Sequence, residues 1–296
     1  MSRKKCIVGP RDGNLRWLCG VPRGMRIAIA LLPVAIAAAQ GPDAREIVRR
    51  SLEASEQNWK IARNYTFLQR TEERRMDAGG GVKSKEVKTY DITLLEGSPY
   101  IRLVARDDHP LPPAEEKKEQ DKLQKSIAER MKETPAQRER RISEYDRRRK
   151  RQQDEMREVG DAFDFRVLGS DRVDGHDVWV LQATPRPGYQ PRSRDAKILP
   201  HVRGKLWIDQ KTFHWARLEA EVISPVSWGL FLVRLDSGAR LHFDMTRVND
   251  EVWLPQRIWI SASARLGLFK RLRIEEETVY KDYRKFQTDS HMIATH

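Results

Sequence analysis

The chain has 296 residues, of which 39% are hydrophobic and 33% charged, and it contains 2 Cys and 8 Trp. This composition excludes a polytopic membrane protein, because only one apolar stretch could engage a bilayer, and it also excludes a fully disordered chain. The 56 Lys and Arg residues against 43 Asp and Glu give a net charge of +13, which taken alone indicates an anionic partner such as nucleic acid or lipid.

The first forty residues have the features of a secretory signal peptide. An apolar run over 27–39 follows Arg23 and Arg26 and ends in three alanines before Gln40. A basic region, a short apolar region and small residues at the cleavage point are typical of such a leader, and the run is too short to span a bilayer comfortably. We therefore expect export and cleavage near Ala39, and the alternative is an uncleaved N-terminal anchor.

Both cysteines, Cys6 and Cys19, precede this cleavage point. The mature chain is then free of cysteine, which excludes disulfides, zinc thiolates and thiol nucleophiles. The leader also removes seven basic residues and one acidic residue, so 49 basic residues remain against 42 acidic ones and the net charge falls to +7. This excess fits contact with an anionic membrane surface better than binding to nucleic acid.

The first element expected after the leader is an amphipathic helix over 43–62. Apolar residues recur there at helical spacing behind Pro42 and Asp43, which form a helix start signal. Such a helix needs a surface to lie on. Three strands joined by turns are expected next, at 64–77, at 82–96 and, after a turn at 97–99, up to Arg106.

Residues 114–158 change character abruptly, with 15 Lys or Arg and 12 Asp or Glu in 45 positions. Thr134 and Pro135 supply an N-cap and an N1 proline, which predict a hairpin of two long charged helices. The basic run at 147–151 suggests nucleic-acid binding, but acidic residues interleave at helical spacings suited to ion pairs. We expect a solvated arm, either a candidate docking arm for an inner- or outer-membrane protein or an insertion with a structural role.

The remainder of the chain is predicted to be rich in strands. A basic, proline-rich stretch over 185–203 interrupts them as a long ordered loop. Short connections make neighbouring strands antiparallel, so we expect one extended meander of about ten strands that curls as its twist accumulates. The strands of this second part are expected at 163–173, 177–184, 204–209, 213–223, 239–248, 251–264 and 270–283.

Alternation along these strands predicts one aliphatic and one wet face of the sheet. In 213–223, Leu218 and Val222 share the aliphatic face, whereas Trp215 and Arg217 share the wet one. The expected covers of the aliphatic face are the N-terminal helix and the apolar stretch 225–235, read as a short helix across the mouth of the curved sheet. Either these covers fill a closed core, or they leave a groove that accepts an apolar ligand.

No catalytic or metal-binding constellation stands out. The 7 His lack the spacing of a metal-binding helix, the glycines at 79–81 lack the Lys-Ser/Thr of a phosphate loop, and no G-x-S-x-G elbow is present. Acidic residues are abundant enough to supply a glycosidase pair, but no pair is distinctive. We expect a protein without enzymatic activity, metal or cofactor.

Four segments carry a family resemblance in this order of elements. They are GKLWID at 204–209, WARLE at 215–219, DEVWLP at 250–255 and YKDYRKF at 280–286. Together with the signal peptide, the first helix and the antiparallel meander, they resemble the LolA/LolB-type lipoprotein-sorting superfamily of double-membraned bacteria. The resemblance covers about 43–106 and 160–287, and the charged hairpin lies outside the family pattern.

The resemblance implies an α+β fold, with an unclosed β-barrel over 40–113 and 159–290. We expect the charged hairpin 114–158 to be inserted into this barrel. It implies a periplasmic carrier that shelters acyl chains of lipoproteins or other lipids during transit toward the outer membrane. We expect this carrier to be a monomer. The alternative is an envelope interaction or sensor module with a closed core, which binds a partner protein through the hairpin. Candidate groove residues are Leu206, Ile208, Leu218, Val222, Leu241, Phe243, Ile258, Ile260, Leu272 and Ile274, and candidate lid residues are Trp228, Leu230 and Phe231.

Overall fold

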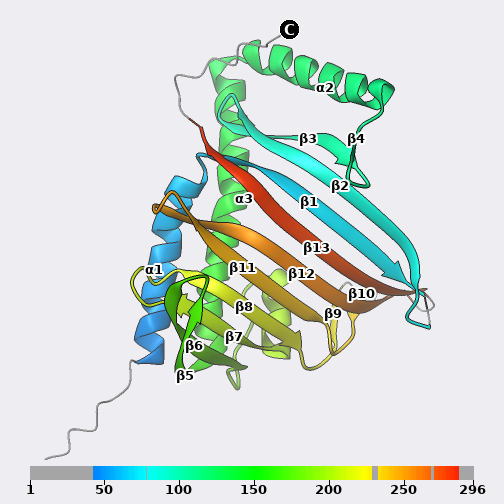
Figure 1. Ribbon diagram of the computed structural model, residues 1–296. Coiled ribbons are helices and arrows are strands. Elements are labelled where there is room, and N and C mark those ends of the chain that lie inside the picture. The colour runs from blue at the N-terminus through cyan, green and yellow to red at the C-terminus, as the bar shows by residue number, and fades with distance from the viewer. Residues whose placement is uncertain (1–42, 78, 229–232, 268–269, 287–296) are drawn as a thin grey trace, which may run out of the picture. The chain divides into compact units, whose positions relative to one another are not determined.

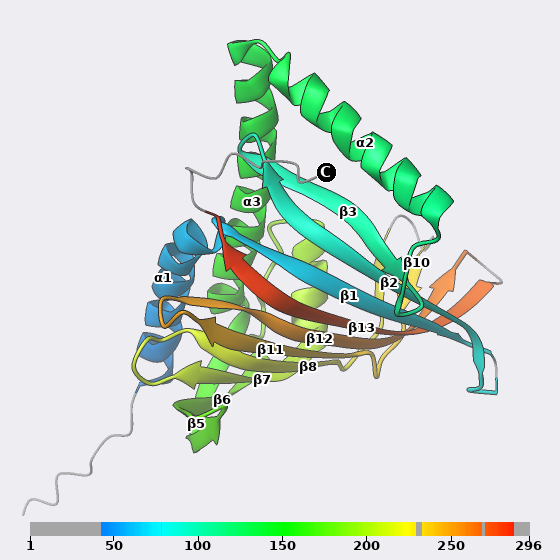
Figure 2. The same ribbon diagram turned by 45° about the horizontal axis from the view of Figure 1, so that its top comes forward.

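The computed structural model describes residues 43–77, 79–228, 233–267 and 270–286. Within these ranges, thirteen strands form one antiparallel sheet that is not closed into a barrel, and α1 and α3 lie side by side on one face of it (Figures 1 and 2). The predicted signal peptide over 1–39 lies outside the described residues, as do Leu230 and Phe231. Within the described ranges, no helix combines the length and apolar character needed to cross a membrane.

The elements follow the predicted order closely. The helices are α1 (Ala44–Ala62), α2 (Pro113–Met131), α3 (Pro135–Ala162) and the 3₁₀ helix η1 (Asp195–His201). The strands are β1 (Tyr65–Met76), β2 (Val82–Leu95), β3 (Ser98–Arg106), β4 (His109–Pro110), β5 (Phe163–Val173), β6 (His176–Pro185), β7 (Val202–Asp209), β8 (Trp215–Val222), β9 (Val226–Trp228), β10 (Val233–Leu235), β11 (Arg240–Val248), β12 (Val252–Leu266) and β13 (Lys270–Lys285).

The predicted N-terminal helix is confirmed as α1. The Asp43 side chain accepts a hydrogen bond from the Arg45 backbone N–H at 3.0 Å and so satisfies one of the free donors at the helix start. The buried face of α1 presents Ile47 and Val48 to the sheet. These two residues belong to the main core cluster, in which they join residues such as Leu181.

The strand order corrects the expected single meander. The sheet runs β4-β3-β2-β1-β13-β12-β11-β8-β7-β6-β5, so two sequential runs are joined by pairing of β1 with β13. The chain therefore leaves the first run at one edge of the sheet, at β4, and enters the second run at the opposite edge, at β5. The connection between them must cross the whole sheet.

The charged helical hairpin makes this crossing. The predicted N-terminus of its second helix is confirmed: Thr134 caps α3 in a capping box with Gln137, and Pro135 occupies the first turn. With 28 residues at about 1.5 Å per residue, α3 is about 42 Å long. It starts near the β2–β3 turn, where Ile142 packs over Gly97, and ends at β5 (Figure 2).

The two helices of the hairpin differ in environment. No residue of α2 is buried, and Arg102 on the neighbouring strand β3 lies 3.5 Å from Glu116 of this helix. By contrast, α3 contacts α1 and η1, and its residues Met156 and Val159 pack against the main core cluster. The expectation of a solvated arm is therefore wrong for α3. Its apolar stripe is thin, but it lies against the sheet side of the molecule.

Two local expectations are also corrected. A β-bulge between Trp207 and Ile208 shifts the register, so that Ile208 pairs with Trp215. Trp215 is consequently buried in the main core cluster on the aliphatic face, where the plain alternation put it on the wet face. The stretch 225–235 does not cross the mouth as a helix, because its described residues form β9 and β10, and β10 extends the sheet beside β12.

Candidate binding cavity

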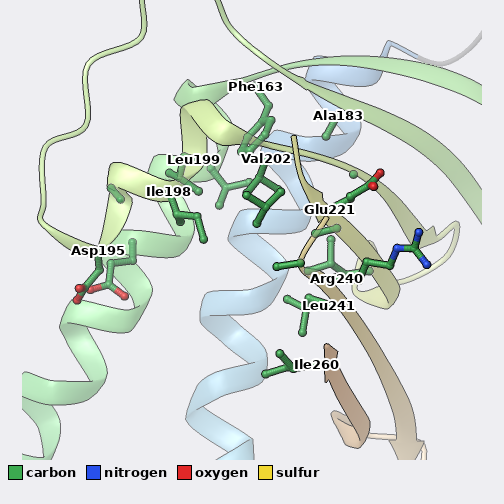
Figure 3. A pocket seen from close by; sticks show the side chains of 18 of the residues that line it. Phe163, Ala183, Asp195, Ile198, Leu199, Val202, Glu221, Arg240, Leu241 and Ile260 are labelled. Atoms are coloured by element: carbon green, nitrogen blue, oxygen red, sulfur yellow. The ribbon is translucent and has the colours of Figure 1, made fainter. Parts of the chain in front are cut away.

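A cavity of about 680 Å³ lies between α3, η1 and the aliphatic face of β7, β8, β11 and β12. Figure 3 shows Ile198 and Leu199 of η1 on one side of this cavity and Leu241 and Ile260 of the sheet on the other. The charged ends of Glu221 and Arg240 lie at its border and point away from these aliphatic side chains. The interior is therefore a hydrocarbon surface with a charged rim.

Small side chains leave the space of this cavity unfilled. At position 204 the main chains of β7 and β8 approach so closely that a Cβ there would lie 2.6 Å from the Glu219 carbonyl oxygen. Protein interiors are normally packed with few voids larger than a water molecule. A cavity of this size is therefore more than a small packing defect, and it results from the small residues that line it. The small lining residues are Ala183, Ala196, Gly204, Ala220, Ala239 and Ala262.

The structure brings half of the predicted groove residues together. Those that line the cavity are Leu206, Leu218, Val222, Leu241 and Ile260. Phe243 lines a neighbouring cavity, and Ile208 is fully buried in the main core cluster. Ile258, Leu272 and Ile274 share the same sheet face by register, but the residues described around either cavity do not include them. Trp228 stands at the end of β9.

Sequence reasoning missed the lid. Its principal parts are the second half of α3, with Met156 and Val159, and η1, with Ile198 and Leu199. A signal for α3 exists in the sequence, since one stripe at spacings of three and four residues faces inward. That stripe consists of the partly buried Ile142, Tyr145, Arg149, Met156 and Val159, together with Gln152, which is exposed but lines both cavities. The high charge of the other faces concealed it.

A second cavity of about 340 Å³ lies between α1, α3, β8 and β11. It shares Gln152, Met156 and Trp215 with the first cavity, so these three residues form the partition between the two. His214 also lines it, and burial lowers the pKa of this imidazole, which keeps it neutral at pH 7. The second cavity extends the apolar space under α3 toward α1.

Buried polar contacts hold the proline-rich loop before η1 against α3. The carboxylate of Glu158, which is 6% exposed, accepts hydrogen bonds from the Tyr189 hydroxyl and from the Arg192 backbone N–H, the latter at 2.6 Å. Burial raises the pKa of Tyr189, with its hydrogen bond to Glu158 as a further cause, so its hydroxyl stays a donor. The indole N–H of Trp228 donates to the Arg194 carbonyl at 3.2 Å. The loop is thereby fixed from both sides.

The helix α3 is in turn attached to α1. The Arg149 guanidinium lies 3.5 Å from the centroid of the Trp59 ring and donates to the Tyr145 hydroxyl at 2.8 Å. Burial lowers the pKa of Arg149 from its ordinary value, but an arginine remains charged at any physiological pH. Arg149, although it belongs to the basic run at 147–151, thus holds the lid helix α3 against α1.

The arrangement is suited to holding an apolar ligand. The described lining provides aliphatic and aromatic contacts, with hydrogen-bonding groups at the rim. Among the described residues, no group of three or more His, Cys, Asp or Glu side chains is placed to hold a metal ion. A cavity of several hundred Å³ with an apolar lining and a few polar groups is the usual form of a small-molecule site.

No known family profile and no curated protein matches the sequence. Among solved structures, the chain is similar to an outer membrane lipoprotein-sorting protein domain from Vibrio parahaemolyticus, with 12% identity, a TM-score of 0.35 and coverage of 83% of this chain and 95% of that one. It is also similar to a LolA superfamily protein from Nitrosomonas europaea, with 11% identity, a TM-score of 0.31 and coverage of 86% and 98%.

A third similar structure is MucB of Pseudomonas aeruginosa in its complex with MucA, with 12% identity, a TM-score of 0.21 and coverage of 83% of this chain and 100% of that one. Each likeness concerns the fold, and the TM-scores mark it as distant.

Proposed function

We propose that this chain is a non-enzymatic carrier of lipid or lipoprotein acyl chains, which it holds in the 680 Å³ cavity during transit through the periplasm toward the outer membrane. The observation that carries this proposal is the apolar cavity itself, with small residues on its floor and a helix and loop as its lid. The same function is implied by the sequence resemblance to the LolA/LolB-type superfamily.

The energetics of such a carrier are favourable. Burying one CH₂ group contributes about 0.8 kcal/mol, so a chain of ~16 carbons gains on the order of 10 kcal/mol before ordering costs are subtracted. Most of the described lining is aliphatic, and the charged ends of Glu221 and Arg240 point away from it. A hydrocarbon chain could therefore be withdrawn from a membrane and kept out of water by contact alone.

Uptake of a fluorescent fatty acid tests this function, together with native mass spectrometry of protein purified from the periplasm. We expect bound lipid in the purified protein and saturable uptake. The variant Ala262→Trp fills the cavity and should abolish uptake, whereas Ser261→Trp should leave it intact, because neighbouring residues on β12 point to opposite faces. Wild-type protein without lipid and without uptake would overturn the proposal.

A second candidate function rests on α2. None of its residues is buried, and Met131 at its end is 74% exposed, so this helix presents a free surface to a protein partner. Deleting 114–158 would not separate the two functions, because α3 forms a wall of the cavity. Reversing the charge of Lys117, Lys118 and Lys125 leaves that wall in place. If the chain is a partner-binding module, this variant should lose partner capture, and neither it nor the wild type should take up lipid.

A further inference from the structure

Arginines on the wet face of the sheet are generally paired with acidic residues on neighbouring strands. Arg203 lies 2.9 Å from Glu221, and Arg257 lies 2.6 Å from Glu277. Arg217 similarly contacts Asp244 at 2.7 Å. Opposite charges on adjacent strands stabilise a sheet, whereas like charges directly opposite each other destabilise it.

One end of the sheet departs from this rule. Arg234 on β10 is the register partner of Arg265 on β12, and Arg265 is the register partner of Arg271 on β13. Arg273 follows two residues later on the same face of β13. All four side chains are exposed, and we name them the arginine ladder.

The arginine ladder is poorly compensated by acidic residues. Among the described residues, Asp236 is the acidic side chain within ion-pair distance of the ladder, 3.8 Å from Arg265. Three positive charges on directly paired positions therefore repel one another across strands only about 4.8 Å apart. Elsewhere on this face arginines are generally paired with acidic residues, whereas the arginines of the ladder face one another. This unfavourable arrangement indicates that the ladder binds an anionic ligand.

The ladder lies next to the cavity. Leu235 follows Arg234 in β10, and Ala262 lies three residues before Arg265 in β12; both line the cavity from the other face of the sheet. In Figure 2 the ends of β10, β12 and β13 lie together at one side of the sheet. Val233 at this end is 39% exposed and lies with Leu235 on the opposite face from Arg234.

We propose that the arginine ladder docks the protein on a bilayer by binding the phosphate groups of anionic phospholipids, which places the border of the cavity at the membrane surface. Guanidinium groups bind phosphate through paired N–H donors, and anionic phosphates between the arginines remove their mutual repulsion. This docking does not depend on what the cavity holds, so it stands or falls separately from the carrier function.

Vesicle flotation tests the proposal, with phosphatidylcholine vesicles that contain or lack phosphatidylglycerol. Wild-type protein should float only with the anionic vesicles and should be released by salt. The triple variant Arg234→Gln, Arg265→Gln, Arg271→Gln should bind about a hundredfold more weakly, since each arginine near an anionic surface contributes about a factor of five. Its melting temperature should not fall, because the substitution removes a repulsion, and fatty-acid uptake should be unchanged.

The matched control removes three exposed positive charges from α3, in the variant Arg147→Gln, Arg148→Gln, Arg151→Gln. It has the same net charge as the ladder variant and should keep most of its vesicle binding. Equal loss in both variants would show that binding follows net charge alone and would overturn the proposal. Absence of wild-type binding at low salt would do the same, as would complete competition by inorganic phosphate at matched ionic strength, since that identifies a site for free phosphate.

Discussion

The two halves of the helix-facing side of the sheet carry opposite chemistry. Ile260 on β12 lines the cavity, and its register partner on β13 is Glu276. The same row continues with Glu73 on β1 and Glu86 on β2. In this row the apolar surface therefore ends between β12 and β13, although Ile274 and Leu272 continue it on β13 closer to the β12–β13 connection. The change from aliphatic Ile260 to acidic Glu276 in this row limits the extent of the cavity, together with the lid that covers it.

The halves are also stabilised differently. In the half that bears the cavity, α1 packs its aliphatic residues on β5 to β8 to form the main core cluster. In the other half, on the wet face, the buried carboxylate of Glu72 lies 2.6 Å from Arg74, 3.0 Å from Arg70 and 3.2 Å from Lys85. Stability in the first half should depend mainly on packing, whereas stability in the second should depend on the charge of this carboxylate and therefore on acidic pH.

The variant Glu72→Gln should give the largest effect on stability. Burial tends to raise the pKa of Glu72, but hydrogen bonds from Arg70, Arg74 and Lys85 outweigh it and lower that pKa to about 2. Because the folded pKa lies below the unfolded value, this carboxylate stabilises the fold fully above about pH 5, and the contribution is lost as the pH falls toward 2. We expect a loss of about 2–3 kcal/mol at pH 7 that shrinks at pH 3, measured by urea denaturation.

Glu277→Gln is the control for this experiment, because its partner Arg257 is about half exposed and their ion pair lies at the surface. It should cost less than about 1 kcal/mol at either pH. A similar loss for both carboxylates, or a loss for Glu72→Gln that is independent of pH, would contradict the assignment of the second half to charge pairing.

The variant Gly204→Ala tests the half that bears the cavity. The added Cβ would lie 2.6 Å from the backbone oxygen of Glu219, so β7 and β8 must move apart. We expect a loss of about 1–3 kcal/mol, as for other overpacked positions, with the same value at pH 7 and pH 4. A melting temperature equal to that of the wild type would show that the two strands are less constrained than their register indicates.

Elements with a strong local pattern could be predicted from the sequence, and long-range pairings could not. The period of α1, the caps of α3 and the turns between strands are local signals, and these elements lie where they were expected. The pairing of β1 with β13 joins residues more than 180 positions apart and has no local signal. The bulge that turns Trp215 inward is likewise a property of the strand pair. The side of the candidate cavity that the sheet forms could be predicted, because apolar and polar residues alternate along its strands. The lid could not be predicted, because its inward face is a thin stripe on a charged helix.

The smallest predicted effect concerns that lid. Arg149→Lys keeps the positive charge but removes the planar group that lies over Trp59, so the contact between α3 and α1 should weaken by about 1 kcal/mol. The neighbouring exposed residue offers a matched control, Arg148→Lys, which should change nothing. Because α3 covers both cavities, the loosened lid should exchange its backbone amides faster near Gln152 and should release a bound fluorescent fatty acid faster, by less than tenfold. Equal release rates for the two variants would show that α3 does not gate the cavity. Retention of the fatty acid would then depend on the side chains of the sheet alone.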